Sequence, residues 1–229
     1  MGTATEIRTR TGMGTRGWIL AGAAALAIIV VAAVVLATGG ERQTAGVSWH
    51  AQQEAAGNVG PVDGASATLV RRDSSIAYEF NATSLTSGNA YTLWLVVVNN
   101  PEACAGSPCS APDFFQNEAT GTQVLYGGSG DVAGDSGELT LSGSLSEGPV
   151  EGWMENRSFA DAETAQIHLV INDHGTELAE FMPGMIETYR GGCSNDSPFP
   201  EIFPPTALAD GEVGPNTCRL TQSAVFLGQ

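Results

Sequence analysis

The sequence predicts an all-β protein, an antiparallel β-sandwich preceded by one N-terminal transmembrane helix. A long uncharged run lies near the N-terminus, and short segments rich in β-branched and aromatic residues follow it. These segments do not alternate with helical patterns, which argues against a parallel α/β fold. Glycine accounts for 29 of 229 residues, well above its usual share of about 7%, as a fold with many tight turns requires.

The run from Trp18 to Thr38, WILAGAAALAIIVVAAVVLAT, is the predicted membrane helix. At 1.5 Å per residue its length is roughly 31 Å, which matches a hydrocarbon core of about 30 Å. Three arginines precede it, so residues 1–17 are expected in the cytoplasm and the rest of the chain outside. The alternative is a signal peptide cleaved near Ala37, which also exports the remainder.

Two further segments complete the predicted organisation. Residues 39–65 are rich in glycine, alanine and glutamine and lack a sustained hydrophobic period, so we expect a flexible tether. Residues 66–229 are then the extracytoplasmic β-sandwich domain. This placement predicts a cell-membrane protein with a single span and its C-terminal domain outside.

Charge narrows the range of partners. The chain carries a formal charge of −16, and beyond residue 38 it has 24 acidic residues against six arginines. Such a surface repels nucleic acid and anionic lipid, because binding to phosphate depends on basic side chains. All nine basic residues are arginine, which indicates a bacterium with a GC-rich genome; the alternative is a salt-adapted organism, since acidic surfaces can suit high salt.

Four cysteines in an exported domain favour two disulfides. Four cysteines allow three connectivities, and the spacing favours two local bridges, Cys104–Cys109 and Cys193–Cys218. The spacing matches neither the paired C-x-x-C of zinc sites nor a redox dithiol. The cysteines are therefore predicted to be structural.

The strands follow from hydrophobic patterning. Residues 75–82 alternate apolar and polar side chains, as in a strand with one buried face, whereas residues 91–99 are almost continuously apolar and predict a central strand buried on both faces. A turn at 133–137 is expected to pair the segments around it. Residues 180–189 predict a short helical turn interrupted at Pro183. Other expected strands cover 67–72, 138–145, 165–173 and 218–228.

The segment AQIHLVINDHG holds two of the three histidines, His168 and His174. On a strand, Ile167, Leu169 and Ile171 face one way while His168 faces the other. Six residues of strand span about 20 Å, too far for both histidines to reach one ion unless the chain reverses. We therefore expect His168 to lie on the face of the sheet, bonded to a neighbouring strand, and His174 to lie in a loop beside a glycine turn. The alternative is a metal-dependent redox or binding protein using both histidines with copper, zinc or calcium, completed by Asp113 or Asp173.

The segment SPFPEIFPPT, residues 197–206, combines four prolines with three apolar residues, Phe199, Ile202 and Phe203. Proline-rich segments favour an extended conformation that grooves recognise at low entropic cost. Packing against the domain itself is one interpretation, and contact with an envelope protein or a wall polymer is the other. The sequence contains neither the G-x-S-x-G motif of a serine nucleophile nor a phosphate-binding loop.

Three motifs, NNPEAC…C, IHLVINDHG and GGC…C, resemble a family of uncharacterised exported or membrane-anchored bacterial β-sandwich proteins. The resemblance covers roughly residues 66–228 and implies structural cysteine pairs. The strand pattern is also similar to CHRD domains and copper/zinc superoxide dismutase. Those families carry H-x-H on one strand, where Val170 holds the second position here, so this resemblance does not imply copper binding.

The sequence thus predicts an extracytoplasmic binding or structural module of the cell envelope, not an enzyme and without a cofactor. The metal-dependent alternative names His168 and His174. No residue pattern identifies the ligand.

Overall fold

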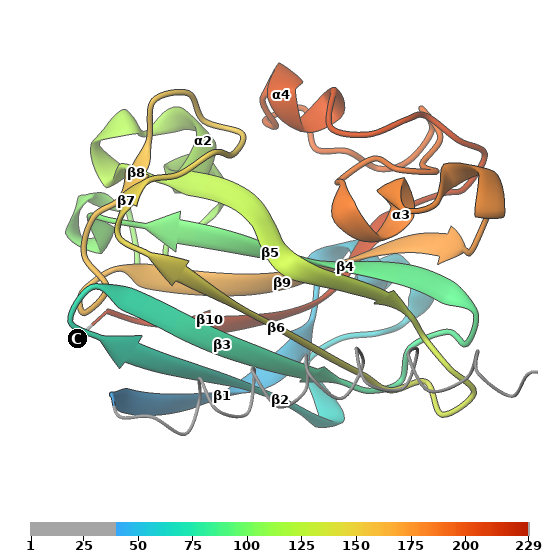
Figure 1. Ribbon diagram of the computed structural model, residues 1–229, viewed down its shortest axis with the longest axis horizontal. Coiled ribbons are helices and arrows are strands. Elements are labelled where there is room, and N and C mark those ends of the chain that lie inside the picture. The colour runs from blue at the N-terminus through green and yellow to red at the C-terminus, as the bar shows by residue number, and fades with distance from the viewer. Residues whose placement is uncertain (1–39, 229) are drawn as a thin grey trace, which may run out of the picture. The chain divides into compact units, whose positions relative to one another are not determined.

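The computed structural model describes residues 40–228, which form an eight-stranded antiparallel sheet (Figure 1) and a separate two-stranded ribbon, β7–β8. In the large sheet the strand order is β5-β4-β9-β10-β1-β2-β3-β6. The elements in chain order are β1 (Glu41–Trp49), η1 (Ala51–Ala56), β2 (Pro61–Arg72), β3 (Ser75–Ala82), β4 (Asn89–Val98), η2 (Pro101–Ala103), α2 (Ala111–Gln116), η3 (Glu118–Thr120), β5 (Gln123–Val132), β6 (Leu139–Ser146), β7 (Gly148–Pro149), β8 (Ser158–Phe159), β9 (Gln166–Thr176), η4 (Ala179–Phe181), α3 (Gly184–Glu187), α4 (Pro205–Leu208) and β10 (Arg219–Phe226).

The two edges of the large sheet, β5 and β6, come together. The Tyr78 hydroxyl of β3 donates a hydrogen bond to the carbonyl oxygen of Gly127 in β5, at 3.2 Å. A Cβ atom on Gly143 of β6 would lie only 2.3 Å from the same oxygen, so the strands need glycine to approach this closely. The predicted all-β antiparallel class is confirmed, but the eight strands make one nearly closed sheet instead of two separate layers.

The connections between strands follow Greek-key topology. The chain crosses over from β3 to β4 and again from β6 to β9, and the second crossing places β9 beside β4, which comes earlier in the chain. The sequence predicted that residues 138–145 pair with the strand before them, and this pairing is wrong. β6 exchanges its hydrogen bonds with β3, for example Phe80 with Leu141, and only approaches β5.

The prediction of a flexible tether over residues 39–65 is wrong for its described part. Residues 41–49 form β1, which pairs with β2 and with β10, and η1 and the start of β2 follow. Val47 is the one fully buried side chain of β1. This strand is held mainly by backbone hydrogen bonds to its two neighbours, so its sequence shows almost no hydrophobic period. Because β1 is part of the sheet, the domain begins at about residue 40.

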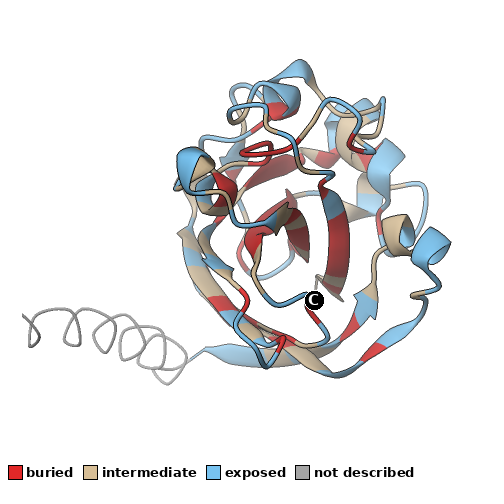
Figure 2. Ribbon diagram, turned by 90° about the vertical axis from the view of Figure 1, so that its right-hand side faces the viewer, coloured by how far each residue is buried: buried red, intermediate tan, exposed pale blue. Residues whose placement is uncertain are grey.

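Side chains of the central strands alternate between two apolar clusters, as predicted for residues 91–99. Leu93, Leu95 and Val97 of β4 join the cluster inside the sheet, where β9 adds Ile167, Leu169 and Ile171. Trp94, Val96 and Val98 join a second cluster on the outer face. Figure 2 shows the buried residues concentrated within the curved sheet. A strand buried on both faces requires a covering layer over the outer one.

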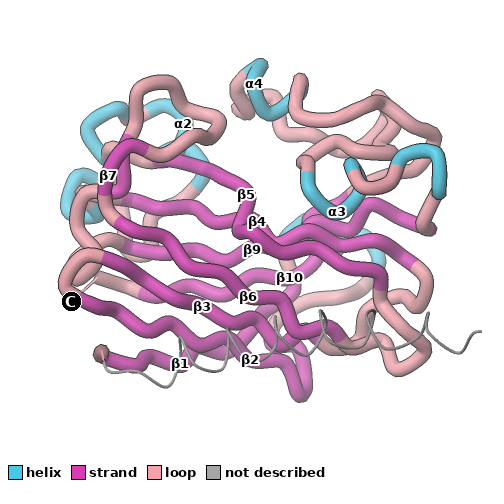
Figure 3. The backbone as a smooth tube through the Cα atoms, in the orientation of Figure 1, coloured by secondary structure: helices cyan, strands magenta, loops and turns pink. Residues whose placement is uncertain are grey.

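Two groups of loops provide that layer (Figure 3). The first, the α2 lobe, comprises residues 99–122 with the Cys104–Cys109 disulfide. The second, the C-terminal lobe, comprises residues 177–218 with the Cys193–Cys218 disulfide and includes the predicted helical turn around Pro183. Both predicted cysteine pairs are confirmed. Each bridge closes a chain segment over the same face of the sheet.

The predicted cytoplasmic tail, residues 1–17, and the predicted transmembrane helix, residues 18–38, lie outside the described residues. Among the helices of residues 40–228, none combines the length and apolar character that spanning a bilayer requires.

Candidate ligand-binding cleft

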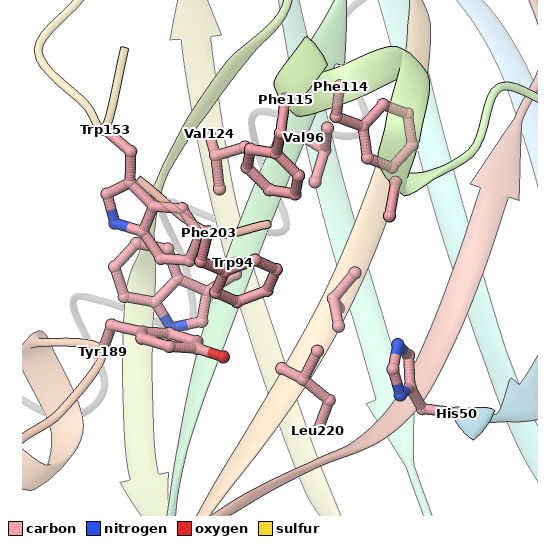
Figure 4. Close-up of a pocket in the computed structure, with 12 residues that line it drawn as sticks. His50, Trp94, Val96, Phe114, Phe115, Val124, Trp153, Tyr189, Phe203 and Leu220 are labelled. Atoms are coloured by element: carbon pink, nitrogen blue, oxygen red, sulfur yellow. The ribbon is translucent and has the colours of Figure 1, made fainter. Parts of the chain in front are cut away.

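The outer face of the sheet carries a pocket between the two lobes (Figure 4), which we call the aromatic pocket. Its volume is about 100 Å³. Twelve residues line it: Trp94, Val96, Val124, Val170 and Leu220 from the strands, Ala111, Phe114 and Phe115 from α2, Tyr189 and Phe203 from the C-terminal lobe, and Trp153 and His50. The sheet is therefore the floor, and the two disulfide-bonded lobes supply the walls.

Aromatic rings from five separate segments meet on this floor. The ring centroid of Trp94 lies 5.0 Å from that of Trp153 and 5.3 Å from that of Tyr189. Phe203 lies 4.9 Å from Phe115 and 5.3 Å from Trp153, so it joins the two walls. Contacts of this length between tilted or perpendicular rings are attractive beyond simple burial. They give the pocket a rigid, flat-sided interior.

Trp153 is positioned by the loop 147–157, which includes β7 and contacts Gln123 and Val124 at the start of β5. Its backbone N–H donates to the carbonyl oxygen of Val124 at 2.8 Å, and the Gln123 side chain bonds the backbone of Met154 through both its amide nitrogen and its oxygen. A Cβ on Gly152 would lie 2.4 Å from the Val124 carbonyl oxygen. Glycine at this position lets the loop lie flat on the strand edge.

A second hollow, the acidic pocket, adjoins the aromatic pocket and shares Trp94 and Trp153 with it. Its volume is about 460 Å³. Three carboxylates line it: Glu151 of the loop 147–157, Glu187 of α3 and Asp210 of the C-terminal lobe. Burial raises the pKa of Asp210. Burial and then the nearby Glu187 charge raise the pKa of Tyr126, which also lines this pocket, to about 12.

His174 is fully buried under the C-terminal lobe and links that lobe to the floor. Its Nδ1 lies 2.9 Å from the Gly191 carbonyl oxygen, which can only accept, so Nδ1 carries the proton. Its Nε2 then accepts from the Thr92 hydroxyl at 2.8 Å. The Trp94 indole N–H in turn donates to that hydroxyl oxygen at 2.9 Å. Burial, partly opposed by the Gly191 bond, lowers the pKa of His174 to about 4.

His168 makes different contacts, under the α2 lobe. Its Nε2 accepts from the Gln166 side-chain amide, and its ring lies 4.9 Å edge-on from that of Phe114. Burial lowers its pKa to about 4 as well. The two histidines thus share the outer face of β9, and each supports a different lobe.

The carboxylates proposed to complete a metal site serve other partners. Asp113 accepts from the backbone of Ala105 and of Ser110, which lowers its pKa and caps α2. Asp173 bonds the Asn89 side chain and the backbone N–H of Gly175, while burial raises its pKa. Neither carboxylate is bonded to His168 or His174. This arrangement gives no support to an ion held by both histidines.

One potential metal-ligating group does occur in residues 40–228, formed by His174, Cys193 and Cys218. The two sulfurs form a disulfide, so neither is the thiolate that a metal requires. The Nδ1 of His174, 3.5 Å from the Cys193 sulfur, already donates to Gly191. In this oxidised form the group is structural.

Phe199, Ile202 and Phe203, predicted as partner contacts, are all partly buried. Phe203 lines the aromatic pocket, and Phe199 packs 5.7 Å from the Tyr189 ring with the Arg190 guanidinium 4.8 Å above it. The proline-rich segment therefore forms a wall of the cleft through Phe203.

Sequence reasoning did not identify Trp94, Trp153 or Phe115 as site residues. The usable signal was the outward row Trp94, Val96 and Val98, because apolar side chains on both faces of a strand require a cover. Trp153 lies in a stretch without strand or helix pattern, so nothing in the sequence placed it beside β4.

Comparison with protein-family models, with curated proteins and with solved structures found no match. The cleft is therefore interpreted from its own geometry.

Proposed function

We propose that the domain is an extracytoplasmic binding module that captures a small organic molecule in the cleft between its two disulfide-bonded lobes. No reaction is assigned to it. The aromatic pocket is the observation that carries the proposal, because binding sites for small molecules are concave, mostly apolar and furnished with a few polar groups. Apolar cavities in proteins, on the order of 150 Å³, are known to bind benzene.

The size of the cleft favours a small molecule over a wall polymer. The aromatic pocket, about 100 Å³, accommodates one apolar group, and the adjoining acidic pocket, about 460 Å³, accommodates the remainder. Ligand pockets commonly measure about 300–1,000 Å³. The pre-formed ring contacts mean that binding requires little ordering of side chains.

The cellular location is part of the proposal. The uncharged run 18–38 is the predicted anchor, and two disulfides are typical of an oxidising compartment outside the cytoplasm. Labelling intact cells with a membrane-impermeant reagent tests this placement. Modification of a cysteine introduced at Leu227, which is half exposed, is the expected result, and protection of that cysteine in intact but not lysed cells would contradict it.

The binding proposal is tested by narrowing the pocket from an exposed position. Ala111 lines the aromatic pocket yet is exposed at the first turn of α2, so Ala111→Trp fills the mouth without disturbing the core. Ala119→Trp is the control, since Ala119 is exposed in η3 and lines neither pocket. The measurement is a fluorescence titration of residues 38–229 with benzyl alcohol, a neutral ring.

We expect saturable binding to the parent domain and to Ala119→Trp, and a loss of affinity of at least about tenfold in Ala111→Trp, the size of effect that steric exclusion from a pocket produces. Equal binding to all three proteins would place the ligand elsewhere. Absence of saturable binding to the parent would remove the proposal.

The metal-dependent alternative using His168 and His174 remains a prediction with its own test. Both rings are buried, neutral and hydrogen-bonded, and their partners favour a structural role. Metal analysis of the purified domain decides it. Stoichiometric copper, zinc or calcium that disappears in a His168→Leu variant would establish the alternative.

A further inference from the structure

The acidic pocket contains an unusual combination of groups, three carboxylates beside aromatic rings. Glu151, Glu187 and Asp210 line it together with Trp94, Trp153 and Tyr126. No basic side chain lines it among residues 40–228. The side chains therefore combine negative charge with ring surfaces.

The chemistry of this lining distinguishes between kinds of cation. A calcium ion needs six to eight oxygen ligands at short range, and aromatic rings occupy much of this wall. An organic ammonium group fits a lining of rings and carboxylates, because the faces of tryptophan and tyrosine rings attract it and nearby carboxylates neutralise its charge. The rings therefore favour an organic cation over a metal ion.

The basic residue next to Tyr189 does not neutralise these carboxylates through hydrogen bonds. The guanidinium of Arg190 donates to the carbonyl oxygen of Leu208 and to the side-chain oxygen of Asn195, each at 2.9 Å. It also lies over the ring of Phe199. Its contacts thus direct it to the interior of the C-terminal lobe.

Trp153, which lines this pocket, also carries a buried polar atom without a partner. Its side chain is 6% exposed, and its indole N–H has no hydrogen-bond acceptor. Burial raises the pKa of the nearby Asp210 carboxyl, and the Tyr189 backbone and then the Trp153 side chain lower it, so the N–H lies near this carboxyl without forming a hydrogen bond to it. Figure 4 shows the indole nitrogen on the side of the ring away from Leu220 and His50. A polar group of a ligand can bond this N–H.

We infer that the ligand of the cleft is an organic cation that carries an apolar group. Its ammonium group lies among Glu151, Glu187 and Asp210, and its apolar group enters the aromatic pocket across the shared rings of Trp94 and Trp153. This inference rests on the proposed function, which supplies the apolar half of the site.

Three probe molecules distinguish binding in the aromatic pocket from binding in the acidic pocket. Benzyltrimethylammonium carries a ring and a cation, benzyl alcohol carries the ring alone, and tetramethylammonium carries the cation alone. We expect benzyltrimethylammonium to bind the domain, residues 38–229, about tenfold more tightly than benzyl alcohol, since its ammonium group adds a partly desolvated contact with the aromatic rings. Tetramethylammonium should bind more weakly than benzyltrimethylammonium.

Variants that lack two of the carboxylate charges test whether the ammonium group binds in the acidic pocket. Glu151→Gln/Glu187→Gln removes two charges from exposed side chains, so the fold is retained. Glu54→Gln/Glu163→Gln is the matched control, because both side chains are exposed and line neither pocket. We expect the first variant to lose about tenfold in affinity for benzyltrimethylammonium and less than about twofold for benzyl alcohol, because only the former carries charge.

Failure of the inference and failure of the proposed function are distinguishable. If benzyl alcohol binds and benzyltrimethylammonium binds no more tightly, the cleft binds neutral molecules and the inference is overturned. If neither probe binds the parent domain, the proposed function itself fails. Equal losses in the pocket variant and its control would show only a long-range effect of net charge and would also overturn the assignment.

Discussion

The Nδ1 atom of His174 lies 2.9 Å from the carbonyl oxygen of Gly191, a contact that joins the floor of the cleft to one of its walls. Through Thr92, the same imidazole also orients the Trp94 indole on the floor. The hydrogen bonds that link Trp94, Thr92, His174 and Gly191 are buried, and each has a defined donor and acceptor. A histidine that resembled a metal ligand in sequence is thus a positioning residue.

Removing this imidazole should destabilise the domain strongly. His174→Leu leaves the Thr92 hydroxyl without an acceptor and the Gly191 carbonyl without a donor in a buried site, which we expect to cost about 3–4 kcal/mol of unfolding free energy. His168→Leu is the comparison, since His168 makes one side-chain hydrogen bond, and about 1–2 kcal/mol is expected. Urea unfolding followed by tryptophan fluorescence measures both. Equal losses would contradict the linking role of His174.

Stability should fall as the pH drops below about 6.5. Burial lowers the folded-state pKa of both His168 and His174 from 6.5 to about 4, so the unfolded chain binds more protons in that interval. The contribution is fully present above about pH 6.5 and is lost on acidification toward pH 4, at most about 3 kcal/mol for each ring.

The raised pKa values of Asp173 and Asp210 act in the opposite direction at lower pH, so the interval just below pH 6.5 isolates the histidines. Urea midpoints measured across this interval should decrease, and the slope should be smaller in His168→Leu. A midpoint that rises or stays constant on acidification would contradict neutral, buried imidazoles.

The two disulfides should differ in their effect on stability. Replacing Cys193 and Cys218 by serine opens a loop with a sequence separation of 25 residues and should cost roughly 3.5 kcal/mol, whereas opening the Cys104–Cys109 loop should cost roughly 2 kcal/mol by chain entropy. Thermal unfolding of the two double variants checks the order. A larger loss from the shorter loop would show that the α2 lobe contributes more than loop closure.

Gly152 should be intolerant of a side chain. In Gly152→Ala the new Cβ would lie 2.4 Å from the Val124 carbonyl oxygen, so the loop 147–157 must move and Trp153 with it. We expect a loss of about 1–3 kcal/mol and a changed tryptophan emission. Gly134→Ala is the control, because nothing lies within 4 Å of its Cβ position. Unchanged emission in Gly152→Ala would contradict this account of how Trp153 is held.

Sequence patterns identified the elements that bury side chains, and missed those held by the backbone. Residues 91–99 were predicted correctly as a strand buried on both faces. For residues 165–173 the facing was also correct, because Leu169 lies in the interior cluster while His168 lies on the outer face against Phe114. β1 was missed because only Val47 is fully buried. Its pairing with two neighbours depends on backbone ladders, which leave no period in the sequence.

The cleft depends on contacts between segments that are distant in the chain, and these could not be read from spacing. Phe115 and Phe203 are 88 positions apart yet their rings lie 4.9 Å from each other. The cysteine pairs were predictable because each bridge is local. His174 was singled out correctly as a notable residue, but its role depends on Gly191 and Thr92, which only the folded lobe brings to it.

The most direct test of the binding cleft is the indole N–H spectrum of residues 38–229, which contain three tryptophans. Trp94 and Trp153 line both pockets, whereas Trp49 packs against the interior cluster of the sheet. On titration with benzyltrimethylammonium, the account predicts saturable shifts of the Trp94 and Trp153 resonances with Trp49 unchanged. Shifts confined to Trp49, or no shift in any of the three, would contradict it.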